Sequence, residues 1–484
     1  MATQFNRRQF FSATGISAVH LLALGCEKRS HAEPAKAEQA LSAAQTGGAE
    51  PYGWGPFVET KAPVHVRESF KISVIQRAGD RMSDGHKMLP QPDGMACFQG
   101  ADGQYVLLRN HELGDMGHAQ RFGVDSTWFA DKVFPSHAYR PRQFGGVSRL
   151  VVDGKKLNAA FSQGATHSAE ALVDSRYVLL GTDKNCAGGQ YQDYWLTCEE
   201  SSAEHHGYAF ATRTSDTKLN RPRRLDSWGR LHREAVAVDE TTGIVYMTED
   251  RVDGCLYRFV PNDKNRPFEE GRLEALMIPG LSTTDPYPMP ESGKPVQSVW
   301  KTNQSWVVEW VPIEDPQATV MSCRQQGHKL KATRFTRNEG ITIDAKGVWF
   351  TASLGGPAKA GQIFRLSHQS GQSEQTLELV YEVTDRTQLS CPDNLVCAPW
   401  GDLIMAEDNY VVTPGVETQF VRGLTRDGHV YDILKANPEF KGKRGLTPEF
   451  AGACFSPDGK VLFVNVQSPV NMTIAVTGPW PQQV

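Results

Sequence analysis

The sequence lacks the short motifs of several common enzyme classes. It contains no CxxC pair, no GxSxG segment, no GxxxxGK[ST] loop and no HExxH segment. Without a CxxC pair, a structural zinc site of the finger or ribbon type is disfavoured. The other three absences argue against an acyl-transfer enzyme of the nucleophile-elbow type, a nucleotide-driven enzyme and a zincin-type metalloprotease.

Excess positive charge and long hydrophobic runs are also missing. The formal net charge is −4, so the chain has no basic footprint of the kind that binds nucleic acid. Beyond the first 26 residues, no segment is long and apolar enough to span a bilayer. We therefore expect neither a nucleic-acid partner nor a transmembrane span.

The first residues have the features of an export signal. Arg7-Arg8 precedes an apolar run over 16–24 and then Gly25-Cys26. A paired arginine before a short, weakly apolar core predicts a twin-arginine signal over residues 1–26, the alternative being a chance pair in a basic start. The expected partner during export is the twin-arginine translocase, and the expected location is the periplasm or the extracellular space. Residues 21–26 also resemble a lipoprotein processing box, which leaves open whether Cys26 carries a lipid tether.

Residues 27–50 are rich in alanine, glutamate, lysine and glycine and contain no aromatic residue. Such a segment cannot bury enough surface to offset the entropy of ordering it, so it is predicted to be a flexible tether. Residues 51–484 are expected to form a single catalytic domain that acts as a monomer. Its aromatic residues suffice for a large core, and the 44 glycines and 28 prolines of the chain predict many turns.

One sequence unit recurs in this domain: a short apolar run, a turn with aspartate or glycine, a second apolar run, and a polar or acidic end. The six copies begin near Gly94, Glu170, Glu234, Glu339, Asp393 and Glu449. Short strands at repeated intervals, with almost no helical period, predict an all-β six-bladed propeller, with a double-sheet sandwich as the alternative. A polar, proline-rich insert from about Asn262 to Arg337 is expected to lie as loops on one face.

The starts of four units carry carboxylates: Glu234, Glu339, Asp393 and Glu449. The innermost strands of a propeller run in the same direction around the axis, so these side chains are expected to meet on one rim. Clustered carboxylates repel one another unless cations neutralise them, and the pattern therefore favours a site for hard metal ions such as calcium. The alternative for each single carboxylate is a solvated strand end or turn former.

Eight cysteines follow Cys26: Cys97, Cys186, Cys198, Cys255, Cys323, Cys391, Cys397 and Cys454. An even number in an exported protein permits disulfides. Several of them sit inside apolar strand patterns, however, and a body of this size does not need disulfides for stability. Most are therefore expected to be buried as small hydrophobic residues.

Two segments carry a specific family resemblance, 181–200 (GTDKNCAGGQYQDYWLTCEE) and 449–469 (EFAGACFSPDGKVLFVNVQSP). Both resemble the PhoX family of exported alkaline phosphatases. The likeness continues through RNHE (109–112), GRLHREAVAVD (229–239), YMTEDR (246–251), RNEG (337–340) and PDNL (392–395), and so covers the mature chain in order. It implies a phosphate monoesterase with a pair of ferric ions and several calcium ions around a bridging oxygen.

Residue by residue, the resemblance implies the following roles. Cys198 is the iron-binding thiolate and part of the catalytic centre, and Arg337 faces the substrate phosphate. The implied carboxylate ligands are Glu112, Glu200, Glu234, Glu339 and Asp393. Alternation along a strand lets Cys198 and Glu200 share one face while Glu199 points away.

The chain departs from the family pattern at two places. Arg233 separates His232 from Glu234, which the family has adjacent, so Glu249 remains a rival ligand to Glu234. The segment 190–195 (QYQDYW) also differs from the family, and because it leads towards Cys198 it is expected to alter substrate access.

The implied chemistry has a physical basis. A phosphate ester hydrolyses very slowly alone, and clustered metals both neutralise the phosphoryl charge and supply a metal-bound oxygen nucleophile. Carboxylates suit calcium, whereas a thiolate among carboxylates suits iron. Two other functions remain open: a calcium-dependent propeller lactonase or esterase, which has no use for a thiolate, and a non-catalytic binding propeller. Small phosphate esters are the expected substrates.

Overall fold

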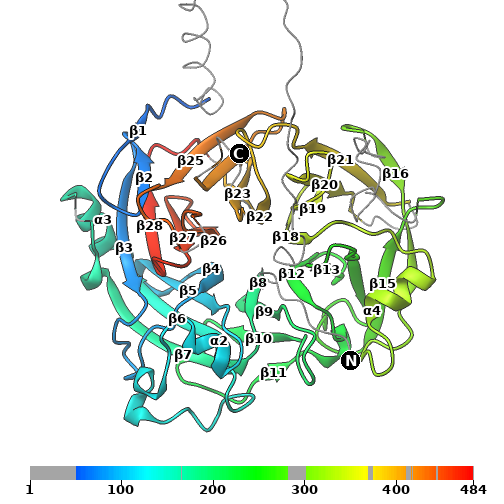
Figure 1. Ribbon diagram of the computed structural model, residues 1–484, viewed down its shortest axis with the longest axis horizontal. Helices are drawn as coiled ribbons and strands as arrows, with labels where there is room; N and C mark the ends of the chain where they lie inside the picture. The colour runs from blue at the N-terminus through cyan, green and yellow to red at the C-terminus, as the bar shows by residue number, and fades with distance from the viewer. Residues whose placement is uncertain are drawn as a thin grey trace, which may run out of the picture. The chain divides into compact units, whose positions relative to one another are not determined.

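The computed structural model describes residues 51–164, 166–281, 301–368, 374–409, 416, 418–442 and 445–482. The predicted signal and tether, residues 1–50 with Cys26, lie outside the described residues. Six antiparallel sheets stand around a common axis (Figure 1), so the prediction of an all-β six-bladed propeller is confirmed. We number the blades by their innermost strands in chain order: β4 (Pro92–Gln99), β8 (Asn185–Tyr191), β12 (Arg233–Val238), β18 (Asn338–Asp344), β22 (Pro392–Cys397) and β26 (Phe450–Phe455).

The remaining strands build each blade outwards from the axis. Blade 1 adds β5 (Gln104–His111), β6 (Gly145–Asp153) and β7 (Leu172–Thr182), and blade 2 adds β9 (Tyr194–Glu199), β10 (Ala209–Arg213) and β11 (Arg223–Arg224). Blade 3 adds β13 (Val245–Glu249), β14 (Tyr257–Pro261), β15 (Gly271–Met277) and β17 (Glu309–Pro312). Blade 4 adds β19 (Gly347–Ala352), β20 (Gln362–Leu366), β21 (Thr376–Glu382) and β16 (Ser305–Val307).

Strands from the start of the described chain complete the last two blades. Blade 5 adds β23 (Leu403–Glu407), β24 (Phe420–Leu424), β25 (Val430–Ala436), β2 (Val64–Arg67) and β1 (Phe57–Val58), and blade 6 adds β27 (Val461–Val466), β28 (Met472–Thr477) and β3 (Lys71–Arg77). The pairings of β2 with β25 and of β3 with β28 join the first strands to the last blades. Backbone hydrogen bonds thus close the ring.

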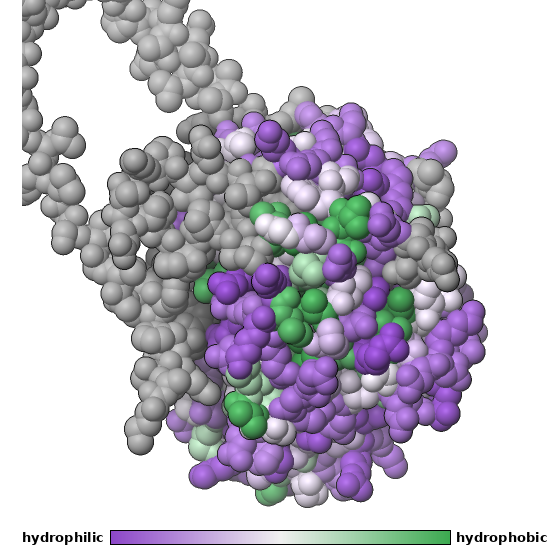
Figure 2. Space-filling model, turned by 90° about the vertical axis from the view of Figure 1, so that its right-hand side faces the viewer, coloured by the Kyte–Doolittle hydropathy of each residue, from purple (hydrophilic) through white to green (hydrophobic). Residues whose placement is uncertain are grey.

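The insert over 262–337 is more than loop. It supplies β15 and β17 to blade 3, β16 to blade 4 and the helix α4 (Cys323–Lys329). The other two α-helices of the described chain are α2 (Met116–Gln120) and α3 (Gly154–Ser162). None of these described helices has the length and apolarity needed to cross a bilayer. Hydrophilic residues cover most of the coloured surface in Figure 2, and apolar residues form small separate patches there.

Each interface between neighbouring blades has its own apolar core. Aromatic residues are prominent in these layers, as with Phe350 stacked on Phe364 at 5.2 Å between ring centroids, in the core between blades 3 and 4. Another layer, between blades 2 and 3, contains Cys198 with Leu196, Val236 and Val245. The eight described cysteines are all free thiols, and seven of them are buried, Cys397 being half-buried.

All six inner strands share one irregularity near their first residue. Between Pro92 and Met95, for example, β4 has one residue more than its partner strand, which is a β-bulge. The same shift occurs in β8, β12, β18, β22 and β26. Glycine allows the strands to converge here, since a Cβ on Gly94 would lie 2.6 Å from the Cα of Ala187.

Candidate metal centre

The bulges divide each inner strand into two functional positions. In each bulge two residues stand opposite one residue of the partner strand. The first of the two has a side chain that could bind a metal in five blades: Asp93, Cys186, Glu234, Glu339 and Asp393; blade 6 has Gly452 there. The second bulge residue lines a central channel and is Gly94, Ala187, Ala235, Gly340, Asn394 or Ala453. The bulge therefore turns one side chain towards the rim and its small neighbour towards the axis.

The strand paired with each inner strand supplies a second donor. Glu112, Glu200, Asp250 and Asp408 directly follow β5, β9, β13 and β23, at the end that pairs with the start of the inner strand. Blade 4 has Ser353 at this position, and its hydroxyl donates to Oε1 of Glu339 at 3.1 Å. Two adjacent strands thus present their donors at the same rim.

These donors form four groups in which the ligand atoms all lie within 4.8 Å of one another. The groups are Asp93, Glu112 and Cys186; Cys186, Glu200 and Glu234; Glu234, Asp250 and Glu339; and Asp393, Asp408 and Glu449. The shared residues Cys186 and Glu234 join the first three groups into one chain of donors across blades 1 to 4. The fourth group lies on blades 5 and 6.

Cys186 is the thiol of this chain of donors. Its side chain is buried, and Sγ lies 3.6 Å from Oδ2 of Asp93. Burial raises the pKa of the Cys186 thiol well above its usual range, and the negative charges of Asp93, Glu234, Glu112 and Glu200 raise it further. Four carboxylates that act on one buried thiol are costly unless cations bind among them. The donor set therefore fits metal ions.

Arg337 joins the same rim from the residue before β18. Its Nε and Nη2 donate to the two carboxylate oxygens of Asp250 at 2.7 and 2.8 Å, and Nη2 also contacts Glu339. The backbone of Arg337 has φ +60°, a left-handed conformation that non-glycine residues seldom adopt. The two carboxylates thus fix a planar, permanently charged group beside the donor chain.

Most of the predicted ligands are brought together by the fold. Glu112, Glu200, Glu234, Glu339 and Asp393 each belong to one of the four groups. Cys198 does not: among the described residues it is in none of the groups, and it lies instead in the apolar layer between blades 2 and 3. Its Sγ is closest in polar contact to the carbonyl of Leu196 at 3.8 Å, and burial raises the pKa of the Cys198 thiol to about 12.

The position of Cys198 corrects the expectation drawn from strand alternation. Strand β9 ends at Glu199, so Glu200 lies beyond the last regular pair and forms a bridge with His232 instead. The alternation of Cys198 and Glu200 on one face is therefore interrupted. Cys186 in the facing bulge of β8 takes the place that we had expected for Cys198.

Glu249, the rival to Glu234, also has a different place. It accepts hydrogen bonds from the hydroxyl of Tyr257 at 2.9 Å and from the backbone N–H of Cys255 at 3.3 Å. It belongs to none of the groups found among the described residues, whereas Glu234 belongs to two. The intervening Arg233 is fully buried and donates to three backbone carbonyls, so its insertion before Glu234 serves packing.

Sequence reasoning missed Asp93, Cys186, Asp250 and Asp408 as candidate ligands, whereas Glu449, which was expected on the rim, belongs to the fourth group. Two signals were available. A donor followed by a small residue recurs as Asp93-Gly94, Cys186-Ala187, Glu234-Ala235 and Glu339-Gly340. The acidic ends HE, EE, ED and ED recur at 111–112, 199–200, 249–250 and 407–408. Alignment of the six units on these pairs identifies Cys186 and the second carboxylates.

The departure at 190–195 lies away from this rim. Tyr191 and Tyr194 pair at the hairpin that joins β8 to β9, at the opposite end of both strands from Cys186. Gln190, Gln192 and Trp195 line the central channel. The position of the segment 190–195 therefore does not support the expectation that it alters substrate access to the rim.

Comparisons with known proteins identify the family of this chain and a solved structure with a similar fold. The family model described as "Alkaline phosphatase PhoX" matches residues 53–470. A solved structure of Pseudomonas fluorescens PhoX in complex with vanadate, a transition state analogue, is similar over 88% of this chain and 97% of that one, with 16% identity and a TM-score of 0.58. A gluconolactonase from Xanthomonas campestris covers 89% of this chain and 100% of its own, with 12% identity and a TM-score of only 0.36. A search of curated protein sequences found no match.

Proposed function

Because the chain belongs to the PhoX family of alkaline phosphatases, we propose that it hydrolyses phosphate monoesters at a multinuclear centre of iron and calcium on the rim. The observation that carries this proposal is the chain of three linked donor groups in which a single buried thiol, Cys186, stands among carboxylates. Vanadate imitates a phosphoryl group in transfer, so its binding by the similar solved PhoX also supports a phosphate substrate.

The donor chemistry indicates which residues would hold which ions. Cys186 with its neighbouring carboxylates Asp93, Glu112, Glu200 and Glu234 suits iron, because a thiolate favours a transition metal over calcium. The remaining groups contain oxygen donors only and suit calcium: Glu234, Asp250 and Glu339 in one, and Asp393, Asp408 and Glu449 in the other. In this proposal the thiolate role passes from Cys198 to Cys186.

When bound, the metals supply Lewis acidity that neutralises the charge of the phosphoryl group. The protein side chains perform the positioning. Asp250 and Glu339 hold the guanidinium of Arg337, so its charge is oriented before substrate arrives. Arg337 would then donate to phosphate oxygens as a planar pair of N–H groups.

We also retain the proposal that Arg7-Arg8 directs the protein through the twin-arginine translocase to the periplasm or the medium. This route carries folded proteins, which suits a site that must assemble from six blades before it meets competing ions. Whether Cys26 is lipidated can be read from the mass of the mature N-terminus.

The function is tested on purified native protein by p-nitrophenyl phosphate turnover at alkaline pH together with elemental analysis. We expect iron and calcium in the same preparation, and activity that a chelator removes and the two metals together restore. Calcium without iron, with turnover of a lactone and none of the phosphate ester, would establish the propeller lactonase instead. A protein that turns over neither substrate would be a binding propeller. Bis(p-nitrophenyl) phosphate in parallel separates monoesterase from diesterase activity.

A further inference from the structure

Lys184 occupies the short link between β7 and β8, directly beside the donor chain. Its backbone N–H donates to the carbonyl of Leu113 at 2.8 Å, and its carbonyl accepts from the N–H of Glu200 at 3.0 Å. Lys184 has φ +51°, a left-handed conformation that costs a lysine roughly 1–3 kcal/mol. The backbone is therefore tied to the segments of two donors, Glu112 and Glu200, in a conformation that local preference does not favour.

Arg251 lies on blade 3, two residues after β13 and directly after the donor Asp250. Its backbone N–H donates to the carbonyl of Glu249 at 2.8 Å, and its own carbonyl accepts from the N–H of Arg337 at 2.8 Å. Arg251 and Arg337 are thus backbone neighbours at the rim. Arg251 and Lys184 approach the donor chain from blades 3 and 2.

The two side chains differ from the other cations near the rim because they have no counter-ion. Arg337 is paired with Asp250 and Glu339, and Arg324 with Asp253 at 2.9 Å. Neither Lys184 nor Arg251 makes a side-chain hydrogen bond or ion pair with any described residue, although both are half-buried. Their charged groups are therefore available to form charge-assisted hydrogen bonds with an anion that enters the rim.

Backbone contacts on the two sides of His232 connect the two cations. His232 forms a bridge with Glu200, whose N–H is bonded to the carbonyl of Lys184, and its Nδ1 lies 3.8 Å from Oε1 of Glu200. The next residue, Arg233, pairs with Glu249, whose carbonyl accepts from the N–H of Arg251. Lys184 and Arg251 therefore both lie close to His232 and to the candidate ligand Glu200.

We propose that Lys184 and Arg251 form a second anion subsite beside the metal centre, which takes a further anionic oxyacid group on the alcohol part of the substrate. The preferred substrates are then phosphate esters whose leaving group carries a carboxylate or a second phosphate. Arg251 offers a planar fork to two oxygens, and Lys184 a point charge. This inference rests on the proposed phosphatase function and specifies its substrate class.

The test compares three substrates with one aromatic frame: phenyl phosphate, 4-carboxyphenyl phosphate and 1,4-phenylene bisphosphate. We expect kcat/KM for one or both of the substrates with a second anion to exceed that of phenyl phosphate about tenfold, the size of one charged hydrogen bond. The substrate with the higher kcat/KM shows whether the subsite binds a carboxylate or a phosphate. The variants Lys184→Gln and Arg251→Gln are each expected to abolish most of this preference, and Arg251→Lys to keep part of it.

Lys346 provides the control, because it is exposed in the β18–β19 turn at the other end of blade 4. Lys346→Gln should leave the preference ratio at the native value. A native enzyme with equal kcat/KM for the three substrates overturns the subsite. A preference that survives in both Lys184→Gln and Arg251→Gln also overturns the subsite. The same holds if these variants lower kcat/KM by the same factor for all three substrates, because the two cations would then act on the transferred phosphoryl group. Absence of phenyl phosphate turnover in the native protein would instead overturn the phosphatase function itself.

Discussion

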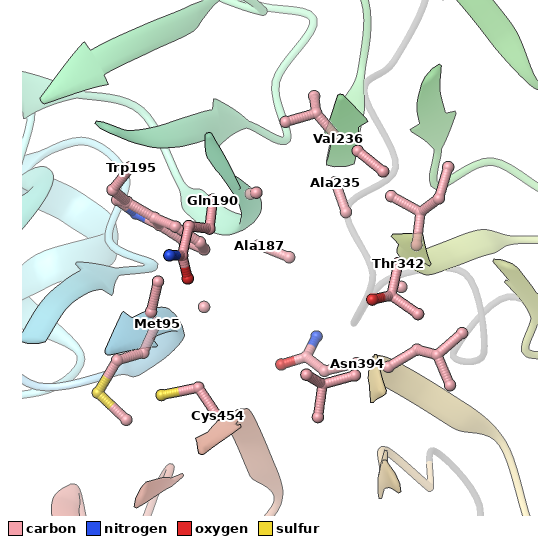
Figure 3. Close-up of a pocket in the computed structure, with 18 of the residues that line it drawn as sticks. Met95, Ala187, Gln190, Trp195, Ala235, Val236, Thr342, Asn394 and Cys454 are labelled. Atoms are coloured by element: carbon pink, nitrogen blue, oxygen red, sulfur yellow. The ribbon is translucent and has the colours of Figure 1, made fainter. Parts of the chain in front are cut away.

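The two ends of the inner strands differ sharply in chemistry although the same six strands build both. At the rim, the bulges and the neighbouring strand ends carry nine carboxylates and one thiol in the four donor groups. A few residues further along, the strands line a channel of about 420 Å³ with side chains such as Met95, Ala187, Ala235 and Thr342 (Figure 3). Asn394, which is labelled in Figure 3, lines the channel and is hydrogen-bonded to the rim residue Asp393. The bulge therefore separates a charged rim from a channel lined largely by uncharged side chains, although the two are only one or two residues apart on each inner strand.

The acidic pairs repeat this separation within single strands. Glu199 accepts from the backbone N–H groups of Asp183, Gly207 and Tyr208 at 2.8–3.1 Å and bonds His206 at 2.7 Å, whereas its neighbour Glu200 belongs to the donor chain. Glu249 and Asp250 divide in the same way, as do Glu407 and Asp408. One acid of each pair stabilises the blade and the other faces the rim.

The largest effect on turnover is expected when the two acids of one pair are replaced separately by glutamine. Glu200→Gln should lower kcat/KM for p-nitrophenyl phosphate about 100-fold or more with little change in stability, because a direct ligand should matter at least as much as a residue that only supports one. Glu199→Gln should instead lower the free energy of unfolding by roughly 3–5 kcal/mol, because it breaks a buried charged network, while the folded fraction keeps near-native turnover. Urea unfolding and kinetics on both variants check this. Equal loss of turnover in the two variants would contradict the division of roles.

A smaller effect is expected at the residue that links rim and channel. Asn394 donates from Nδ2 to Oδ1 of Asp393 at 3.1 Å and accepts from the N–H of Gly452 at 2.5 Å. Asn394→Ala should weaken calcium binding about tenfold, because outer partners orient metal ligands, and should cost roughly 1–3 kcal/mol for the unsatisfied Gly452 N–H. Calorimetric titration with calcium measures the first quantity and urea unfolding the second.

Asn437 is the matched control. Its buried side-chain amide donates hydrogen bonds to the carbonyls of Thr60 and Ala62, which lie between the outer strands β1 and β2 of blade 5. Asn437→Ala should lower stability by a similar amount and leave calcium affinity at the native value. Native calcium affinity in Asn394→Ala would remove Asn394 from the support of Asp393.

The smallest effect is expected in the channel. Thr342 lines it on β18, beyond the bulge that carries Glu339. Thr342→Val keeps the volume of the side chain and removes only the hydroxyl, so we expect kcat/KM within about twofold of native and a change in stability below about 1 kcal/mol. Steady-state kinetics checks this, and a tenfold loss would show that the channel takes part in turnover.

The sequence was sufficient for the propeller because each blade repeats the same strand and turn chemistry, and the carboxylates at Glu234, Glu339 and Asp393 followed from where the inner strands start. The thiolate did not follow. Strand β9 ends at Glu199, so the alternation that placed Cys198 beside Glu200 stops before Glu200, while the bulge in β8 turns Cys186 towards the rim. Asp250 and Asp408 were hidden for a related reason: each has an acidic neighbour, and only the pairing register shows which of the two faces the rim.

The central claim is that Cys186 is the iron-binding thiolate of the rim and that Cys198 is a core residue. Iron content per chain, measured by elemental analysis on purified Cys186→Ser and Cys198→Ser in parallel, tests it most directly. We expect Cys186→Ser to lose iron and p-nitrophenyl phosphate turnover, and Cys198→Ser to retain both with a modest loss of stability. Native iron content in Cys186→Ser, or loss of iron in a folded Cys198→Ser, would contradict the account.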